Sequence, residues 1–536
     1  MANTYANRLR TRLVLQQPTG LWTNSFAYDA ARRLTNVTSP SGAFGYAYDA
    51  LRSTLPTLLT LPNTSYVTNR YDVNARLLYT KLDNSSGTTL DAAEYGYNMG
   101  NQRTTFTNAT GTFVDYTFDL IGQLEIAASS VSSENRGYLY DAAWNLNHRT
   151  NNGVSTTFSV NGLNELTAEG GISCSYDADG NLINQTGTRN GTNYSYDSED
   201  RLVLMQYAAN GTISNATSFV YDGLGRLREQ LQWTTNYGST GQGPLINGNG
   251  SWTLVGGILY VYDGNRVIQE RDTNGNPTTS YTRGNDLSGS LEGAGGIGGM
   301  LARTMGYSSS TGNWSTNDYY HADGNGNITY LVDSSQGLAA SYRYDPFGNM
   351  LSSSGPLVGI NTYQFSSKEY IPTAGFYYYL YRFYDAGLQR WINRDPIQER
   401  GGINIYRFTL NDPVGLVDTK GLYVPLPKAP PIVFPPVIAP IVCAYVVGGI
   451  CACAIDVASC IIWPNPSPDP LPMPKRPPKL HQPKCNDLET ETCWPKTGSP
   501  SYACDFECPS GARHLVQPGP NGCPDTMNFP LPAPSW

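Results

Sequence analysis

A Tyr-Asp dyad recurs along most of this chain and constrains its fold more than any other feature. Neighbouring copies are often 20 to 26 residues apart, as in 48 − 28 = 20 and 71 − 48 = 23. Self-similarity at a period of about 20–50 residues is the signature of a repeat architecture. The ten dyads are Tyr28-Asp29, Tyr48-Asp49, Tyr71-Asp72, Tyr140-Asp141, Tyr176-Asp177, Tyr196-Asp197, Tyr221-Asp222, Tyr262-Asp263, Tyr344-Asp345 and Tyr384-Asp385.

The fuller unit predicts a β-hairpin. It reads aromatic-x-Tyr-Asp, a short gap, then Arg-Leu or Asn-Leu, as in YSYDSEDRL and FVYDGLGRL. Alternation places the two aromatic side chains on one face of a strand. The Asp and the Gly or Asn after it favour a tight turn, in which the carboxylate accepts hydrogen bonds from backbone N–H groups. Since one hairpin cannot bury its own apolar face, the units are expected to stack.

Composition agrees with many short strands joined by turns. The 536 residues include 55 Gly, 38 Tyr and 36 Pro, and only 15% are charged. Helices are therefore not expected to dominate. The formal net charge of −8 argues against a phosphate-binding surface, so we expect the repeats not to bind nucleic acid.

A second, aromatic-rich block covers residues 363–422. It contains FSSKEY, GFYYYLYRFYD, RWINRDP and GGINIYRF, followed by Pro413, Asp418 and Gly421-Leu422. This block resembles the RHS-repeat-associated core of bacterial Rhs and Tc-toxin C proteins. The Tyr-Asp unit resembles the YD repeat of Rhs proteins and teneurins. The resemblance implies a mainly β fold, in which YD-repeat hairpins spiral into a hollow shell, or β-cocoon, that the core block closes.

The composition divides the chain into four expected parts. Residues 1–345 are the repeat shell and 346–422 the core that closes it. Residues 423–484 are a Pro-rich linker with an apolar segment, and 485–536 are a Cys-rich module. A looser stretch over 234–317 is expected to contain insertions or long loops.

The resemblance implies a function for this order. The shell would encapsulate the chain's own C-terminal tail as an effector or toxin-like cargo, with a delivery apparatus or an immunity protein as further partners. The alternative is a non-enzymatic surface protein that binds carbohydrate or mediates adhesion. A third interpretation is a decayed fragment. The first residues hold no apolar run for a signal peptide, so export by a leaderless or upstream-encoded route is expected.

Two carboxylates in the core block are the candidate catalytic groups, 418 − 395 = 23 positions apart. In the resembled family an aspartyl autoprotease cuts after the Leu of a D-P-x-G-L signature, which here has Thr419 in place of Pro. The resemblance implies that Asp395 and Asp418 cut the Leu422–Tyr423 bond, with Arg394 as an electrostatic tuner. One carboxyl of a close pair stays protonated while the other acts as a base. The alternative is structural, with each Asp capping a turn.

The tail leaves several alternatives open. Nine of the ten cysteines lie between Cys443 and Cys523. Disulfides, reduced thiols shielded by the shell, or a metal site completed by His514 would each explain them. The apolar run 437–455 is long enough to span a membrane, but Pro440, two Gly and the following Asp argue against a helix there.

Three further motifs are interpreted as loops and turns. Gly293, Gly295 and Gly298 form a G-x-G-x-x-G without a strand–helix context, so a flexible loop is expected. The runs that start at Asp177 and Asp323 imitate a calcium loop but lack its final Glu. We therefore expect hairpin turns there, and neither a metal nor a cofactor in the shell.

Overall fold

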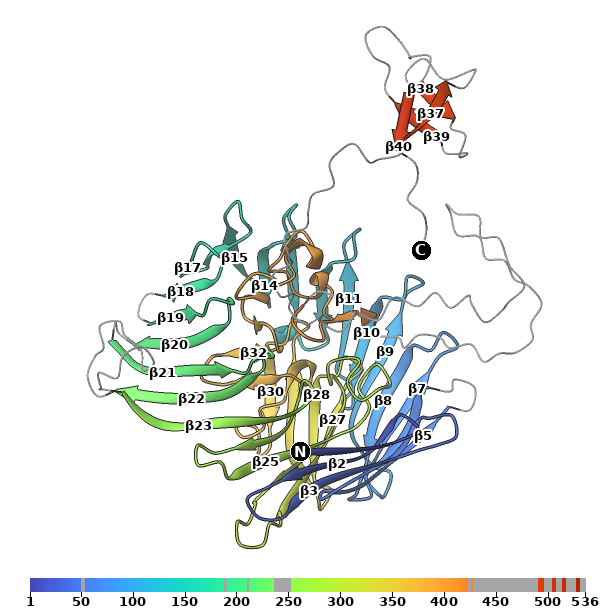
Figure 1. Ribbon diagram of the computed structural model, residues 1–536, viewed down its shortest axis with the longest axis vertical. Helices are drawn as coiled ribbons and strands as arrows, with labels where there is room; N and C mark the ends of the chain where they lie inside the picture. Colours follow the sequence, from blue (N-terminus) through green and yellow to red (C-terminus); the bar gives the residue numbers. More distant parts are fainter. Residues whose placement is uncertain are drawn as a thin grey trace, which may run out of the picture. The chain divides into compact units, whose positions relative to one another are not determined.

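The computed structural model describes residues 1–49, 54–187, 190–209, 212–235 and 252–422, and beyond them the backbone of five short strands. The chain divides into two units, Met1–Tyr445 and Val446–Trp536. The first unit is dominated by one antiparallel sheet (Figure 1). Within the described residues the only helices are four short 3-10 turns, which confirms the predicted β class.

Thirty strands form this sheet, and each pairs antiparallel with the next in sequence. The first fifteen are β1 (Ala2–Ala6), β2 (Leu9–Gln16), β3 (Leu21–Tyr28), β4 (Leu34–Ser39), β5 (Gly42–Tyr48), β6 (Pro56–Thr60), β7 (Tyr66–Tyr71), β8 (Leu77–Asp83), β9 (Thr89–Tyr97), β10 (Arg103–Asn108), β11 (Phe113–Phe118), β12 (Leu124–Ser129), β13 (Arg136–Tyr140), β14 (Leu146–Asn151) and β15 (Val154–Val160). A 3-10 turn, η1 (Ser132–Glu134), precedes β13.

The sheet continues without interruption in its pairing order to Ser354. Its second half is β16 (Leu166–Glu169), β17 (Ile172–Tyr176), β18 (Leu182–Thr186), β19 (Asn190–Tyr196), β20 (Leu202–Ala209), β21 (Thr212–Tyr221), β22 (Leu227–Thr235), β23 (Trp252–Asp263), β24 (Arg266–Arg271), β25 (Pro277–Arg283), β26 (Met300–Met305), β27 (Thr316–Ala322), β28 (Ile328–Asp333), β29 (Leu338–Tyr344) and β30 (Met350–Ser354). Among the described strands β1 pairs only with β2 and β30 only with β29, so the sheet is open.

Most Tyr-Asp dyads end a strand, and the Asp then organises the turn that follows. Asp222 Oδ1 accepts hydrogen bonds from the backbone N–H groups of Leu224 and Arg226, at 2.9 and 3.0 Å. Arg226 Nε donates to the other carboxylate oxygen at 2.8 Å. The turns of Asp72 and Asp197 repeat this pattern. The predicted carboxylate-capped hairpin is confirmed.

The Tyr hydroxyl ties many of the hairpins to an earlier one. Tyr196 donates to the Leu182 carbonyl at 2.9 Å, and Tyr221 donates to the Leu202 carbonyl at 2.7 Å. Further bonds of this kind include Tyr48 to Leu34, Tyr97 to Leu77 and Tyr140 to Leu124. The repeat therefore uses both parts of tyrosine, because the ring packs in the core while the hydroxyl satisfies a carbonyl.

Substitution of Tyr196 separates these two contributions. We expect Tyr196→Ala to lower the free energy of unfolding by about 3 kcal/mol, since its ring packs against the core. Tyr196→Phe removes only the hydroxyl and should cost about 1 kcal/mol. Urea unfolding measures both, with Tyr5→Ala on the exposed strand β1 as a control. A loss below about 0.5 kcal/mol for Tyr196→Ala, the usual size of a surface effect, would contradict this packing.

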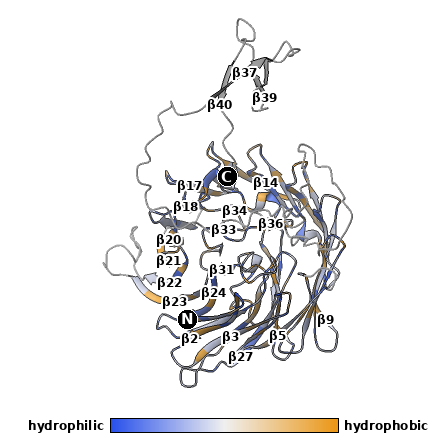
Figure 2. Ribbon diagram, turned by 45° about the vertical axis from the view of Figure 1, so that its right-hand side comes forward, coloured by the Kyte–Doolittle hydropathy of each residue, from blue (hydrophilic) through white to orange (hydrophobic). Residues whose placement is uncertain are grey.

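Two distant runs of the sheet face each other and share a core. Trp22 of β3 lies edge-on to Trp314, just before β27, with ring centroids 5.5 Å apart. Phe44 of β5 meets Tyr319 of β27 at 5.9 Å. Buried and exposed positions alternate along β3, where Trp22, Asn24 and Phe26 are buried, and hydrophobic and hydrophilic residues are interspersed along the strands of the sheet (Figure 2). The early hairpins are thus held against the late ones, as Figure 1 shows for β3, β5 and β27.

The core block, residues 363–422, packs against strands from several parts of the sheet, including β12, β13 and β18–β29 (Figure 1, orange). Its core includes Trp391, which is fully buried, and Tyr384 stacked on Phe408 at 3.9 Å. Its elements are η2 (Phe365–Ser367), β31 (Glu369–Ile371), β32 (Phe376–Tyr378), β33 (Phe383–Asp385), β34 (Arg390–Trp391), η3 (Gln398–Gly401), η4 (Thr409–Asn411) and β35 (Leu416–Val417).

The remaining strands belong to the tail. β36 (Leu426–Pro427) pairs antiparallel with β35. In the second unit a four-stranded sheet has the order β39-β38-β37-β40, with β37 (Thr490–Pro495), β38 (Cys504–Glu507), β39 (Arg513–Val516) and β40 (Met527–Pro530). The cysteine side chains from Cys443 onward, His514 and the apolar run 437–455 lie outside the described residues. No helix in the described part of the chain is long and apolar enough to cross a membrane.

Candidate functional site

The fold brings the two candidate carboxylates to one buried arginine. Asp395 follows β34, Asp418 follows β35, and Arg382 precedes β33. Arg382 Nη2 lies 2.8 Å from Asp395 Oδ2 and 3.8 Å from Asp418 Oδ2. The side chains of all three are at most 6% exposed. Residues that are distant in the sequence thus form a compact charged group inside the core block.

Both carboxylates also cap turns, as the structural alternative predicted. Asp395 Oδ1 accepts from the Ile397 N–H at 3.0 Å. Asp418 Oδ1 accepts from the N–H groups of Lys420 and Gly421, at 3.1 and 2.8 Å. In each Asp one oxygen fixes a turn while the other faces Arg382. Turn capping and the paired arrangement therefore coexist in this site.

Burial shifts the pKa values of Asp418 and Arg382. It raises the pKa of Asp418 to about 6, although Arg382 and two backbone N–H groups oppose the rise. Burial also lowers the pKa of Arg382 below its usual value, and the two carboxylates oppose that fall. A carboxyl group with a pKa near 6 can carry a proton close to neutral pH. That is the property a general acid needs.

Two cations clamp the chain that leads to the expected cleavage point. Lys368 Nζ donates to the Thr419 carbonyl at 2.7 Å and to the Gly295 carbonyl at 3.3 Å. Arg382 Nε donates to the Gly421 carbonyl. Burial lowers the pKa of Lys368 to about 8. The backbone on both sides of Lys420 is therefore held by side chains, without the ring that a proline at 419 would supply.

Gly421 lies where a side chain would not fit. Its φ is +71°, a left-handed conformation that favours glycine. A Cβ there would lie 3.1 Å from both the backbone nitrogen of Arg382 and the Cβ of Tyr379. Leu422 is half-buried and is the last residue before the predicted cut. Its partner in that bond, Tyr423, lies outside the described residues.

The structure does not bring Arg394 to the carboxylate pair. Arg394 Nη2 binds Glu165 Oε1 at 3.1 Å, and its Nε donates to the Tyr406 hydroxyl at 3.3 Å. Although the two residues are adjacent in sequence, Asp395 faces Arg382 while Arg394 faces Glu165 of the shell wall. The cation that contacts both carboxylates is Arg382.

Sequence reasoning missed Arg382 and Lys368, although both stand in the quoted motifs. Arg382 is the cation within GFYYYLYRFYD, and Lys368 is the cation within FSSKEY. Charged residues are almost never fully buried unless they are paired. A lone cation inside an aromatic run was therefore the available signal for a buried anion nearby.

The other sequence motifs are structural. Asp177 Oδ1 accepts from the N–H groups of Asp179 and Asn181, and Asp323 caps its turn in the same way. The predicted hairpin turns are confirmed. The glycine-rich segment is a loop as predicted, held by Asp286, and its Gly295 packs against Thr419. In the described ranges no group of three or more His, Cys, Asp or Glu could hold a metal ion.

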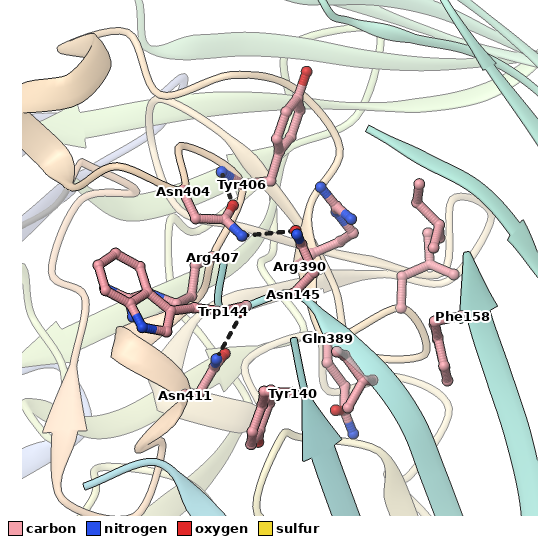
Figure 3. A pocket seen from close by; sticks show the side chains of 13 residues that line it. Tyr140, Trp144, Asn145, Phe158, Gln389, Arg390, Asn404, Tyr406, Arg407 and Asn411 are labelled. Atoms are coloured by element: carbon pink, nitrogen blue, oxygen red, sulfur yellow. Dashed lines mark hydrogen bonds between the residues drawn. The ribbon is translucent and has the colours of Figure 1, made fainter. Parts of the chain in front are cut away.

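A small cavity lies between the core block and the shell wall (Figure 3). Arg390 and Tyr406 line it from the core block, and Trp144 and Asn145 from the wall. Asn404 Nδ2 donates to Asn145 Oδ1 at 2.7 Å across the junction. Its volume of about 20 Å³ is that of about one water molecule. The cavity belongs to the packing of this junction and is too small for a substrate.

A buried carboxyl group also joins the core block to the shell wall. Glu369 of β31 lies 2.5 Å from the Tyr260 hydroxyl, which also lies 3.1 Å from Gln230 Oε1. Burial, with Glu270 nearby, raises the pKa of Glu369 to about 8. One hydroxyl proton cannot serve two acceptors at once. A protonated Glu369 that donates to Tyr260 satisfies both contacts.

This protonation makes stability depend on pH. The folded-state pKa of Glu369 lies above its unfolded value of about 4.3, so stability is complete below that value and is lost as pH rises to about 8. Glu369→Gln keeps the shape without the ionisation. We expect it to raise the free energy of unfolding at pH 8 by at least about 1 kcal/mol, the value of one pKa unit, and to flatten the fall between pH 5 and 8.

Urea unfolding at several pH values measures the effect of Glu369→Gln. The control is Glu94→Gln, because Glu94 is exposed on β9. Equal pH profiles for wild type and Glu369→Gln would show that Glu369 is ionised in the folded protein.

Comparison with known proteins finds similarity to YD-repeat proteins. The Teneurin YD-shell family model matches residues 97–240. The tRNA nuclease WapA of Bacillus subtilis is 25% identical over 337 residues, 61% of this chain and 12% of the relative. Double-stranded DNA deaminase toxin A of Burkholderia cenocepacia is 32% identical over 107 residues, 19% of this chain and 7% of the relative. The chain spans less than half the length of the curated relatives it matches.

A solved structure shares the fold. The crystal structure of the TcdB2-TccC3-Cdc42 complex superposes with a TM-score of 0.55 at 19% identity, over 75% of this chain and 22% of that chain. The continuous YD hairpins, the enclosed core block and these matches define the class: this is a β shell built from YD repeats. The chain is an RHS/YD-repeat shell protein.

Proposed function

We propose that the shell holds residues 423–536 as cargo and separates them from itself by cutting the Leu422–Tyr423 bond. One observation carries this proposal. A buried Asp395–Arg382–Asp418 group lies beside a chain that two cations clamp as far as Gly421. Such a group has the acid and the base that hydrolysis needs, next to a tethered peptide bond.

The chemistry requires only water. Asp395, paired with Arg382, takes a proton from a water molecule, whose oxygen adds to the Leu422 carbonyl carbon. Protonated Asp418 gives its proton to the Tyr423 nitrogen as the carbon–nitrogen bond breaks. Leu422 then ends in a carboxyl group and Tyr423 begins with an amine. Lys368 and Arg382 keep the preceding carbonyls in place, so Thr419 can substitute for a rigid proline.

The relatives support a toxin-type cargo. One is named a tRNA nuclease and another a double-stranded DNA deaminase toxin. By this analogy the tail is an effector that the shell holds inactive, and the protein is secreted or displayed at a cell surface. A delivery apparatus and an immunity protein against the tail are its expected partners.

The test of cargo holding is whether the cut tail stays bound. We expect the purified chain to run as two polypeptides under denaturing conditions, of 422 and 536 − 422 = 114 residues. The same sample should elute as one species on native size exclusion. The control is the sample after mild urea, which should release the tail before β-structure is lost by circular dichroism. A cut tail that elutes separately without denaturant would contradict the encapsulation.

A further inference from the structure

The glycine-rich loop between β25 and β26 has a fixed backbone path. This loop, residues 284–299, folds around the buried side chain of Asp286. Asp286 Oδ2 accepts from the N–H groups of Ala294 and Gly296, at 2.7 and 3.1 Å, and its Oδ1 accepts from the Ser288 N–H at 3.0 Å. Buried polar groups whose hydrogen bonds are satisfied rigidify the segment that carries them. The loop is therefore a rigid part of the shell wall.

This loop contacts the chain that leads to the expected cut. A Cβ at Gly295 would overlap the Thr419 carbonyl oxygen and would lie 3.0 Å from the Thr419 carbonyl carbon. Lys368 Nζ donates to the carbonyls of both residues, at 3.3 Å to Gly295 and 2.7 Å to Thr419. The neighbouring Ser367 Oγ accepts from the Gly298 N–H at 3.0 Å. The shell wall and the cleavage segment thus share one buried cation at their point of closest approach.

Thr419 lies where a small displacement reaches the proposed chemistry. It is next to Asp418, the proposed acid, and it precedes Leu422 by 422 − 419 = 3 positions. The two N–H groups that Asp418 Oδ1 caps follow Thr419 directly. A shift of the Thr419 carbonyl therefore moves both the acid and the chain that carries the scissile bond.

We propose that the glycine-rich loop of the shell is a positioning element for the cut, in which Gly295 sets the place of the Thr419 carbonyl and Lys368 holds it there. The rate of cutting then depends on the shell wall as well as on the core block. This inference rests on the proposed self-cleavage and adds a shell residue to the groups that control it.

A matched pair of alanine variants in the full chain tests the loop. Gly295 and Gly289 belong to the same loop and have φ of +61° and +74°, so alanine is strained at both. A Cβ at Gly289 would have no atom closer than 3.8 Å. Gly295→Ala should slow the cut about 10²-fold, the order expected for a misplacement of about 1 Å at a reacting centre, while Gly289→Ala should cut like wild type.

A time course on denaturing gels during cell-free synthesis measures these rates. Urea unfolding in the Asp395→Asn background, where every chain should stay full length, checks that both variants fold. Equal rates for the two variants, in a wild type that cuts, would overturn the positioning role. A wild type that stays intact would instead contradict the self-cleavage itself.

A double-mutant cycle separates positioning from a general loss of stability. Thr419→Gly loosens the segment and should slow the cut by itself. Gly295→Ala combined with Thr419→Gly should be about as slow as the slower single variant, because changes at two residues in contact are not additive. Fold-changes that multiply would show that Gly295 does not act through Thr419, and would overturn the inference.

Removing the shared cation gives an independent test. Lys368→Met deletes the donor to both carbonyls and should slow the cut about tenfold, since the lost hydrogen bonds are charged. Lys81→Met makes the same change on β8, where the lysine side chain is 39% exposed, and should leave the rate unchanged. Equal rates for the two variants would overturn the role of Lys368 in holding Thr419.

Discussion

Asp395→Asn and Asp418→Asn should each leave the purified protein as one full-length polypeptide. The amides keep the turn-capping oxygens but cannot act as base or acid. Loss of a general acid or base typically slows a reaction about 10²–10⁴-fold. A time course on denaturing gels measures the loss directly, since wild type should accumulate two bands.

The controls separate chemistry from folding. Asp385→Asn changes another carboxyl of the core block, a half-buried one that caps the Leu388 N–H instead of facing Arg382. It should still cut. Thr419→Pro restores a rigid turn and should speed the cut. If the Asn variants at 395 and 418 cut as fast as wild type, the two carboxylates have only their turn-capping role.

Trp391→Ala should cause the largest loss of stability in the core block. Trp391 is fully buried and meets the rings of Tyr379, Tyr384 and Phe408 edge-on, at 5.2 to 5.6 Å. Deleting a buried Trp typically costs about 3–5 kcal/mol, because a cavity replaces its contacts. Urea unfolding measures this loss.

The same substitution should also slow the cut. The Arg382 guanidinium lies over the Trp391 ring at 4.2 Å, so losing the ring loosens the cation between the carboxylates. Leu120→Ala is the control, because Leu120 is fully exposed at a turn and should change stability by less than about 0.5 kcal/mol. An unchanged unfolding midpoint for Trp391→Ala would show that the core block is not part of the cooperative fold.

The repeat unit could be predicted in detail because its interactions are local. Asp222 and Arg226 are four residues apart, so the capped turn is encoded within one copy. The Tyr221 hydroxyl reaches only the neighbouring hairpin, at Leu202. Alternation and turn chemistry therefore predicted the hairpin, its stacking and the β class without knowledge of distant contacts.

The site could be predicted only in part because its partners come from separate turns. Asp395 and Asp418 were expected to lie together, and the carboxylates of both lie within 4 Å of the Arg382 guanidinium. Arg394 is adjacent to Asp395 in sequence, which suggested a shared site, but the two side chains bind different partners, Glu165 and Arg382. Nor did any local pattern predict that the hairpins of Trp22 and Trp314 face each other across the sheet.

Intact mass spectrometry of the purified protein tests the self-cleavage most directly. Wild type should give two masses, one for residues 1–422 and one for residues 423–536, with Tyr423 as the first residue of the smaller piece. Asp418→Asn should give one mass near 58.5 kDa. A single mass of that size for wild type after days at pH 5 to 8, unchanged by Thr419→Pro, would contradict the assignment of this site as a protease.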